Sequence, residues 1–338
     1  MFILNAWYVV AWSSEVTREP ARRIVCSIPV VLYRAIDGTA VALTDRCAHR
    51  GFPLSAGTVV GDAIRCGYHG FTYDGAGACI GIPAQERIPA GMAVRAFPLV
   101  EKDGWLWIWL GDPSDADRAK VADTHWMTDE SWATVTHTVA IACRAELVHD
   151  NLLDLTHESF LYTSTVGDEY IVDYGVSVEV DGDVVSVDRL MPSVQAPPLY
   201  ARTMQTEGLF DRFHCTEFHA PSFHILHSGI TGEGRPREEG HLIKVLNGIT
   251  PVDESTCIYF YAFSRNFAVD QQWATEELQT GLATVLEEDK NALELQEIGL
   301  QSRPSTERDR LIAQDAGIAR ARRVMAGLLD REKASPRG

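Results

Sequence analysis

The chain has 338 residues, enough for two ordinary domains, and its 46% hydrophobic composition is typical of a globular protein rather than a disordered one. Its 30 basic and 47 acidic residues give a net charge of −17, which repels phosphate backbones and anionic lipid surfaces and argues against nucleic acid as a partner. Seven cysteines in so long a chain do not resemble the disulfide frame of a small secreted domain, so we expect a cytoplasmic protein. No apolar run approaches the roughly 18 residues that cross a membrane, and no membrane association is expected.

Short β-rich runs broken by turn residues fill residues 1–112 and predict a small antiparallel β domain. A polar stretch over 113–132, with Pro and Asp, suits a connection between two cores. Residues 133–338 mix both kinds of pattern, with alternating strand-like segments between helical ones, and form the second expected domain. Helices are expected over 146–162, about 271–300 and about 310–330. The fold class is therefore predicted to be α+β.

Two cysteine and histidine pairs lie in the first domain, where Cys47 is followed by His49 and Cys66 by His69. Two thiolates with two imidazoles are the ligand set of a Rieske [2Fe-2S] cluster, whereas a structural zinc site is the alternative for mixed Cys and His donors. The single residue between Cys47 and His49 is too short a spacing for the usual zinc pairs. Glycine and proline also crowd both loops, at Gly51, Pro53, Gly67 and Gly70. The sequence favours the iron–sulfur cluster.

A second candidate metal site begins in the expected helix over 146–162, where Asn151, Asp154 and His157 recur every three residues and would share one side. The rest of that helix is rich in leucine. A carboxylate and an imidazole buried in such a helix must be hydrogen-bonded or bound to a metal. A hydrogen-bonded His and Asp pair without metal is the alternative.

Far downstream, Asp289 falls on the apolar stripe of the expected helix over 271–300. A lone acid at a core position implies a cationic partner. His157 and Asp289 are therefore candidate ligands of a mononuclear non-haem Fe(II), whose open positions would admit dioxygen.

With these residues in place, the chain resembles the Rieske oxygenase α subunits, in particular the short type exemplified by vanillate O-demethylase, dicamba monooxygenase and toluenesulfonate methyl-monooxygenase. The likeness runs through nearly the whole chain, in the segments NAWYVVAW, CAHRGFPLSAG, CGYHGFTYDGAGAC, DNLLDLTHESF, SRNF, EEDK and IAQDAG. It implies an N-terminal Rieske domain and a catalytic domain of the helix-grip type, in which a curved antiparallel sheet folds over a long C-terminal helix. It also implies a homotrimer, in which Asp154 links the cluster of one subunit to the iron ligand His157 of the next.

The family's second histidine ligand, five positions after His157, is Tyr162 in this chain. A phenolate can bind iron but favours the ferric state. Three outcomes are open from the sequence. Tyr162 ligates the iron, or the site is weakened or empty, or another histidine replaces it. The histidines considered are His149, His214, His219, His224 and His227.

The expected activity is that of the oxygenase component of a two-component Rieske monooxygenase. It would hydroxylate or O-demethylate a small aromatic, methoxybenzoate-like substrate with dioxygen. Because the chain has no flavin or nicotinamide fingerprint, the electrons must come from a separate flavin/iron–sulfur reductase. Two alternatives are an oxygenase-like electron carrier or binding protein, with its iron site impaired by Tyr162, and a zinc-stabilised structural protein. The histidines of segment 214–227 could line a pocket for the aromatic substrate.

Overall fold

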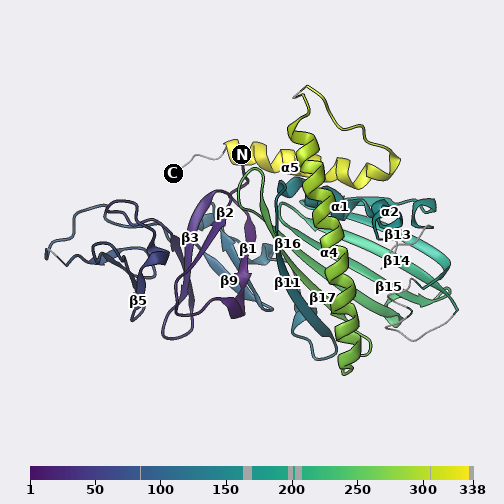
Figure 1. Cartoon of the computed structure of the whole chain (residues 1–338), viewed down its shortest axis with the longest axis horizontal. Coiled ribbons are helices and arrows are strands. Elements are labelled where there is room, and N and C mark those ends of the chain that lie inside the picture. The colour runs from purple at the N-terminus through teal and green to yellow at the C-terminus, as the bar shows by residue number, and fades with distance from the viewer. Residues whose placement is uncertain (84, 163–169, 197–200, 202–207, 305, 335–338) are drawn as a thin grey trace. The chain divides into compact units, whose positions relative to one another are not determined.

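The computed structural model describes residues 1–83, 85–162, 170–196, 201, 208–304 and 306–334. The chain divides into two compact units (Figure 1). One holds residues 2–121 with the short segment 250–253, and the other holds residues 122–249 and the part that follows 254.

The first unit consists of three small antiparallel sheets. Their orders are β1-β10-β9, β2-β3-β4 and β5-β6-β7-β8. The strands are β1 (Trp7–Trp12), β2 (Ala21–Val25), β3 (Ile28–Arg34), β4 (Ala40–Thr44), β5 (Thr58–Val60), β6 (Ala63–Arg65), β7 (Thr72–Tyr73), β8 (Cys79–Gly81), β9 (Leu99–Lys102) and β10 (Trp105–Trp109). The expectation of an antiparallel β domain is confirmed for this unit.

The cysteines of the candidate cluster site rest on the hydrophobic core of the first unit. Cys47 and Cys66 belong to one buried cluster with Val31, Leu43 and Ile64. This core packs the thiol side of both loops against the sheets β2-β3-β4 and β5-β6-β7-β8.

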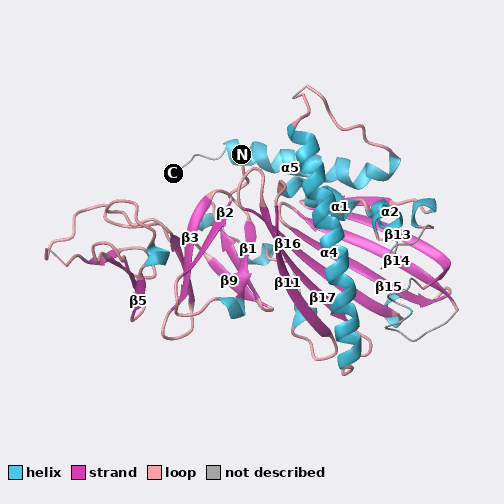
Figure 2. Ribbon diagram, in the orientation of Figure 1, coloured by secondary structure: helices cyan, strands magenta, loops and turns pink. Residues whose placement is uncertain are grey.

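The second unit contains a seven-stranded antiparallel sheet in the order β11-β17-β16-β15-β14-β13-β12. Its strands are β11 (Ala133–Ile141), β12 (Ser177–Asp181), β13 (Val184–Gln195), β14 (Leu209–His219), β15 (Phe223–Gly232), β16 (His241–Pro251) and β17 (Cys257–Arg265). Four α-helices accompany it among the described residues: α1 (Ala145–Leu153), α2 (Glu158–Leu161), α4 (Gln272–Gln301) and α5 (Ala316–Ala334). Figure 2 shows α4 running across the strands.

Helix α4 is held by one apolar stripe. Leu278, Leu282, Leu286 and Leu293 recur at helical spacing and pack into the same buried core as Tyr261 of β17. Asp289 lies within this stripe and is buried. A long helix over an antiparallel sheet is the helix-grip arrangement, so that expectation is confirmed.

The single helix expected over 146–162 is wrong. Helix α1 ends at Leu153, and Asp154 adopts an extended conformation with φ −118° and ψ 93°. A 3-10 turn over Leu155–His157 follows, then the single turn of α2. The Asp154 side chain accepts a hydrogen bond from the Thr156 N–H at 3.0 Å, which caps a new turn instead of continuing the old helix. Asn151, Asp154 and His157 therefore do not share one helical face.

The helix expected over about 310–330 begins later, at Ala316, because its first residues lead into a 3-10 turn over Ala313–Asp315.

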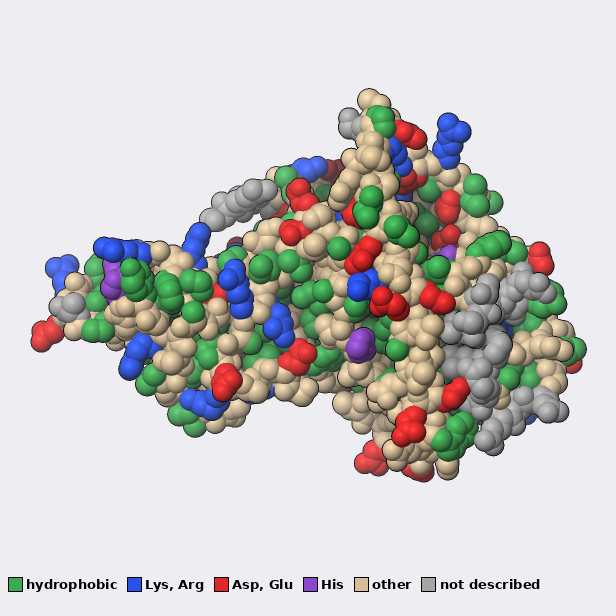
Figure 3. All heavy atoms as spheres, viewed as in Figure 1, with side chains coloured by type: hydrophobic (Ala, Val, Ile, Leu, Met, Phe, Trp, Pro, Cys, Tyr) green, Lys and Arg blue, Asp and Glu red, His purple; other side chains and the backbone are tan. Residues whose placement is uncertain are grey.

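Within the described residues, no helix combines the length and apolar character needed to cross a membrane. Acidic and basic residues are balanced up to residue 121, so the net charge of −17 arises from the rest of the chain. On the face shown in Figure 3, acidic side chains accordingly gather over α4.

Candidate functional site: cluster loops and a second donor set

The two loops that carry the candidate cluster ligands have the same backbone design. In the first, Cys47 N–H donates to the Phe52 carbonyl and Gly51 N–H donates to the Cys47 carbonyl, both at 2.9 Å. In the second, Cys66 N–H donates to the Phe71 carbonyl at 2.8 Å and Gly70 N–H to the Cys66 carbonyl at 3.1 Å. Both glycines have φ +73°, a conformation that other residues adopt only with strain.

This internal repeat was missed in the sequence, although a signal was present. Both loops read Cys, then three residues, then Gly-Phe. The histidine is the second residue after the cysteine in one loop and the third in the other.

The loops bring the four candidate donors together in pairs. The side chains of Cys47 and Cys66 are within hydrogen-bonding contact of each other, and both are buried. The imidazole rings of His49 and His69 lie 4.7 Å apart between centroids, and His69 is exposed. A pair of thiols inside and a pair of imidazoles outside is the donor division that a [2Fe-2S] cluster with two unlike irons requires.

The surroundings of these donors fit an iron–sulfur cluster. The N–H groups of Tyr68 and His69 point at the Cys66 sulfur, and the Tyr73 hydroxyl lies 3.1 Å from the Cys47 sulfur. Such donors stabilise thiolate and sulfide charge. Nδ1 of His49 is buried and makes no hydrogen bond to any part of the chain that the structure describes, so its lone pair is available to a metal.

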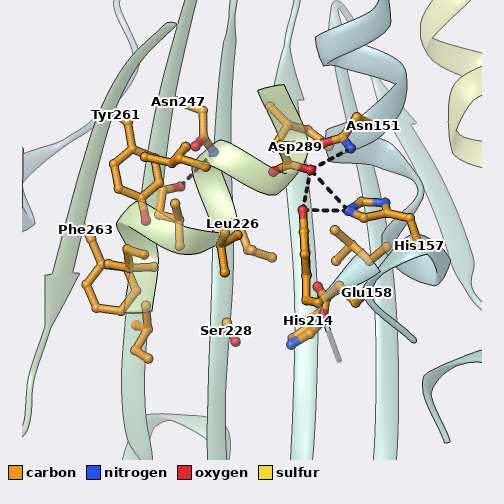
Figure 4. A pocket seen from close by; sticks show the side chains of 18 of the residues that line it. Asn151, His157, Glu158, His214, Leu226, Ser228, Asn247, Tyr261, Phe263 and Asp289 are labelled. Atoms are coloured by element: carbon orange, nitrogen blue, oxygen red, sulfur yellow. Dashed lines mark hydrogen bonds and ion pairs between the residues drawn. The ribbon is translucent and has the colours of Figure 1, made fainter. Parts of the chain in front are cut away.

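The second donor set lies in the second unit, between α2, α4 and the segment before α2 (Figure 4). Tyr162 Oη donates to Asp289 Oδ1 at 2.5 Å and lies 2.9 Å from His157 Nε2. His157 Nε2 and Asp289 Oδ1 are 3.9 Å apart. Asn151 Nδ2 donates to the same Asp289 oxygen at 3.0 Å. Three chemically different donors therefore converge on one point.

The orientation of His157 follows from the break in the helix at Asp154. The carbonyl of Asp154, freed from helical hydrogen bonding, lies 2.5 Å from His157 Nδ1. A neutral imidazole that donates from Nδ1 turns the lone pair of Nε2 toward Tyr162 and Asp289. The Asp154 carboxylate is occupied at Oδ1 by the Thr156 N–H and hydroxyl.

Burial shapes the electrostatics of this set. It raises the pKa of Asp289, an effect that His157 opposes. It also raises the pKa of Tyr162 well above its ordinary value, and the Asp289 carboxylate adds to the rise. Tyr162 is therefore a phenol unless a cation displaces its proton.

The spacing of the three donors fits a metal with facial ligation. Neighbouring donors on a metal with bonds of about 2.1 Å lie about 3 Å apart, close to the separation of His157 Nε2 and Tyr162 Oη. The single phenol proton can serve only one of the two neighbouring acceptors, so a cation would satisfy the set more completely. Only two of these donors, His157 and Asp289, belong to the common metal-ligating types His, Cys, Asp and Glu, and the third is Tyr162, so no group of three such residues around a single ion is found among the described residues at this site.

The other histidines considered from the sequence lie elsewhere. His149 Nδ1 and His224 Nε2 are 2.9 Å apart in a buried pair. His219 and His227 each approach the Glu217 carboxylate at 3.2 Å. His214 lies beside Glu158, with 3.6 Å between Nδ1 and Oε1.

A cavity of about 100 Å³ opens next to the second donor set. Its walls are mainly apolar, from Leu226, Val245 and Phe263, and His157, Tyr162 and the Asp289 carboxylate lie at one end. Of the histidines in segment 214–227, His214 lines this cavity and the other three do not. Its volume is of the same order as that of a dry cavity of about 150 Å³ that holds benzene in another protein, though smaller.

Comparison with known proteins gives a family match in each part of the chain. Residues 6–98 match the Rieske [2Fe-2S] domain, and residues 141–331 match the vanillate O-demethylase oxygenase C-terminal domain. The chain is 34% identical to a putative toluene-4-sulfonate monooxygenase iron-sulfur subunit of Comamonas testosteroni, across 98% of both chains. It is also 34% identical to a vanillate O-demethylase oxygenase subunit of a Pseudomonas species, across 98% of this chain and 96% of the relative.

Among solved structures, dicamba monooxygenase with non-haem iron and dicamba superposes with a TM-score of 0.87 at 29% identity, over 98% of this chain and 99% of that one. Relatedness along the full length of both units, with a Rieske domain followed by the vanillate O-demethylase catalytic domain, decides the assignment. The chain belongs to the Rieske non-haem iron oxygenases and is the oxygenase component of an iron-dependent monooxygenase.

Proposed function

We propose that this oxygenase hydroxylates or O-demethylates a small methoxybenzoate-like substrate with dioxygen. The observation that carries the proposal is the convergence of His157, Tyr162 and Asp289 at the end of an apolar cavity of about 100 Å³. The oxygenases for vanillate and dicamba among its relatives are named as O-demethylases, which supports this class of reaction.

Cys47 and Cys66 would hold one iron of the [2Fe-2S] cluster, and His49 and His69 the other. The histidine pair faces outward, with His69 exposed, so the histidine-bound iron is the one placed to pass electrons on. The cysteine-bound iron would lie inside the loops, where the N–H groups directed at Cys66 would stabilise the negative charge of the thiolate.

His157, Tyr162 and Asp289 would hold the mononuclear iron, with Asn151 fixing the Asp289 carboxylate. When bound, the iron supplies the activation of dioxygen for attack on a substrate C–H bond. Tyr162 would bind as phenolate, because a coordinating cation displaces the proton that burial and Asp289 otherwise hold on the oxygen. The apolar cavity wall excludes water around the ring of the substrate.

The stoichiometry of the proposed reaction shows which other reactants and proteins the oxygenase would need. A methoxy methyl group, dioxygen, two electrons and two protons give the hydroxymethyl ether and water, and the ether then collapses to a phenol and formaldehyde. The electrons would come from a flavin/iron–sulfur reductase. We further propose a homotrimer in which Asp154 joins the cluster of one subunit to His157 of the next, since its backbone carbonyl already orients that imidazole.

Metal and sulfide analysis combined with product screening tests this function. The purified protein should contain about three irons and about two acid-labile sulfides per chain. With a reductase and a panel of methoxybenzoates, it should release formaldehyde and the matching phenol in equal amounts. Two irons per chain and no product from any member of the panel would identify an electron carrier instead, and a colourless protein without sulfide would identify a zinc protein.

A further inference from the structure

The cavity has a second polar region, which lies below the donor atoms of Asp289 and His157 in Figure 4 and begins at Glu158, the residue next to His157. Arg212, His214 and Glu158 line it, together with the hydroxyl-bearing residue Ser228. In Figure 4, Glu158, His214 and Ser228 lie below the group formed by Asp289 and His157, with the apolar side chains of Leu226 and Phe263 to one side. None of these polar residues takes part in the proposed iron ligation.

Arg212 is the cationic residue of this region. It lies on β14, and its side chain is 1% exposed. Its Nη2 donates to Glu158 Oε2 at 3.2 Å. A guanidinium held this deeply at a cavity wall is costly unless anionic or strongly accepting groups face it.

Glu158 is shared between two arginines. Arg189 on β13 is also buried, and the charges of both Arg212 and Arg189 act on the Glu158 carboxylate. Nε and Nη1 of Arg189 make no hydrogen bond to the described residues. Among the described residues, Glu158 is an acid bonded to Arg212, and it shares Arg189 with Asp154, whose Oδ1 accepts from Thr156.

His214 does not supply a negative charge to the two arginines, and in the described part of the chain it forms no hydrogen bond through Nδ1. Burial and the two arginines lower the pKa of its imidazole well below the ordinary value. Its Nδ1 is buried and makes no hydrogen bond within the described residues. A neutral ring with an available nitrogen beside a guanidinium forms a site for an oxygen-rich group with both donor and acceptor character.

We propose that Arg212 is the specificity residue that binds the acidic group of the aromatic substrate, with His214 beside it and Glu158 as the group that limits its affinity. This proposal rests on the proposed function and deepens it. Binding the acid in this region would place the opposite part of the ring toward His157 and Asp289. Orientation of the substrate, rather than chemistry, is the role assigned to Arg212.

The test compares binding of 3-methoxybenzoate with that of its neutral counterpart 3-methoxybenzamide, by calorimetry on the iron-loaded protein. The native protein should bind the benzoate more tightly. Arg212→Gln should weaken benzoate binding by about tenfold to a hundredfold, the usual range for a hydrogen bond to a charged group, and leave benzamide binding nearly unchanged. Glu158→Gln should strengthen benzoate binding, because it removes the competing anion.

Two further variants keep the test decisive. Arg212→Gln alone removes one of the two guanidinium groups that act on the buried Glu158, so the double variant Arg212→Gln with Glu158→Gln removes the whole pair and should fold while losing the benzoate preference. Arg237→Gln is the control, because this arginine pairs with Asp188 at the surface of the same sheet and does not line the cavity. It should bind both ligands as the native protein does.

Equal affinity of the native protein for benzoate and benzamide would overturn the inference, as would an unchanged preference in the double variant. Failure of the proposed function gives a different pattern. In that case benzoate would still bind through Arg212, but no formaldehyde would be released with any methoxybenzoate.

Discussion

The two metal regions obtain their donors in different ways. The cluster loops take all four from residues 47–69, and each loop is closed by backbone hydrogen bonds between a cysteine and the phenylalanine five residues later. The second site joins His157 and Tyr162 to Asp289, which lies 127 positions after the tyrosine. The positions of the cluster donors are fixed by the local backbone of two loops, whereas those of the second site are fixed by the packing of α4 on the sheet. A substitution in the loops should therefore affect the cluster alone, and a substitution at the second site should act through the hydrogen bonds of that site.

The largest expected effect comes from the first region. His69→Ala should abolish the electron-spin resonance of the reduced Rieske cluster and all turnover, because one iron loses a ligand that no neighbouring side chain replaces in its loop. Iron bound at the second site should remain at about one per chain. Loss of that iron too would show that the two regions are not independent, and a cluster that survives replacement of both His49 and His69 would refute the ligand assignment.

Asp154→Ala addresses the link between the regions. It should leave the Rieske spectrum intact and lower turnover by about 100-fold, because the carboxylate proposed to link the two metals is lost while the Asp154 carbonyl that orients His157 remains. Asp154→Asn is the matched variant, because it keeps the cap on Thr156 but removes the charge. If Asp154→Asn turns over at the native rate, the carboxylate has no part in electron transfer.

Tyr162 stands at the position where the resemblance described above implies the family's second histidine ligand. If it ligates ferric iron, the oxidised protein should show a broad phenolate-to-iron absorption beneath the cluster bands. Tyr162→Phe should remove that band and lower iron affinity by about tenfold to a hundredfold. Tyr162→His should raise the affinity for ferrous iron. Full iron content in Tyr162→Phe, with no band lost, would make the tyrosine a spectator. Tyr259→Phe, which removes another buried phenol at the same cavity, is the control.

How far the sequence predicted these regions follows from the same difference. Spacing alone identified Cys47, His49, Cys66 and His69 as candidate ligands, because the loops that hold them are local. Asp289 was found by its place on an apolar stripe. The break at Asp154 was missed, because leucine periodicity through residues 152–155 outweighed the capping tendency of a single aspartate. The role inferred for Arg212 could not be anticipated, since it depends on β14 and α2 meeting at one cavity.

The stability of the second unit should also decrease in acid. Burial lowers the pKa of His149 to about 3 and that of His224 well below its ordinary value. Below about pH 6.5 the unfolded chain binds protons that these folded residues cannot bind. The free energy of unfolding should therefore fall by up to about 1.4 kcal/mol per pH unit between about pH 6.5 and pH 3 because of His149, and His224 should add to the fall. Denaturant unfolding at several pH values, with His149→Gln against the exposed His137→Gln, measures this. An equal slope in both variants would contradict it.

The smallest expected effect tests whether the first region tunes its cluster through one side chain. The Tyr73 hydroxyl accepts from the Ala48 N–H at 3.1 Å, so its own proton is directed at the Cys47 sulfur. A hydrogen bond to a ligating sulfur favours the reduced cluster, which carries more negative charge. If that preference is worth about 1 kcal/mol, it corresponds to roughly 40 mV in a one-electron couple. Tyr73→Phe should lower the reduction potential by about that amount and leave the ligands in place.

Tyr33→Phe is the matched control for this change. Tyr33 belongs to the same buried core, but its hydroxyl donates to the Asp62 carbonyl at 3.1 Å and not to a cluster ligand. Tyr73→Phe loses the bonds to Cys47 and Ala48, and Tyr33→Phe loses the bond to Asp62, so each should be destabilised by about 1 kcal/mol or more in denaturant unfolding. Only Tyr73→Phe should move the potential in redox titration. An equal shift in both variants would assign the effect to loosened packing of the loops, and no shift in either would remove Tyr73 from the control of the cluster.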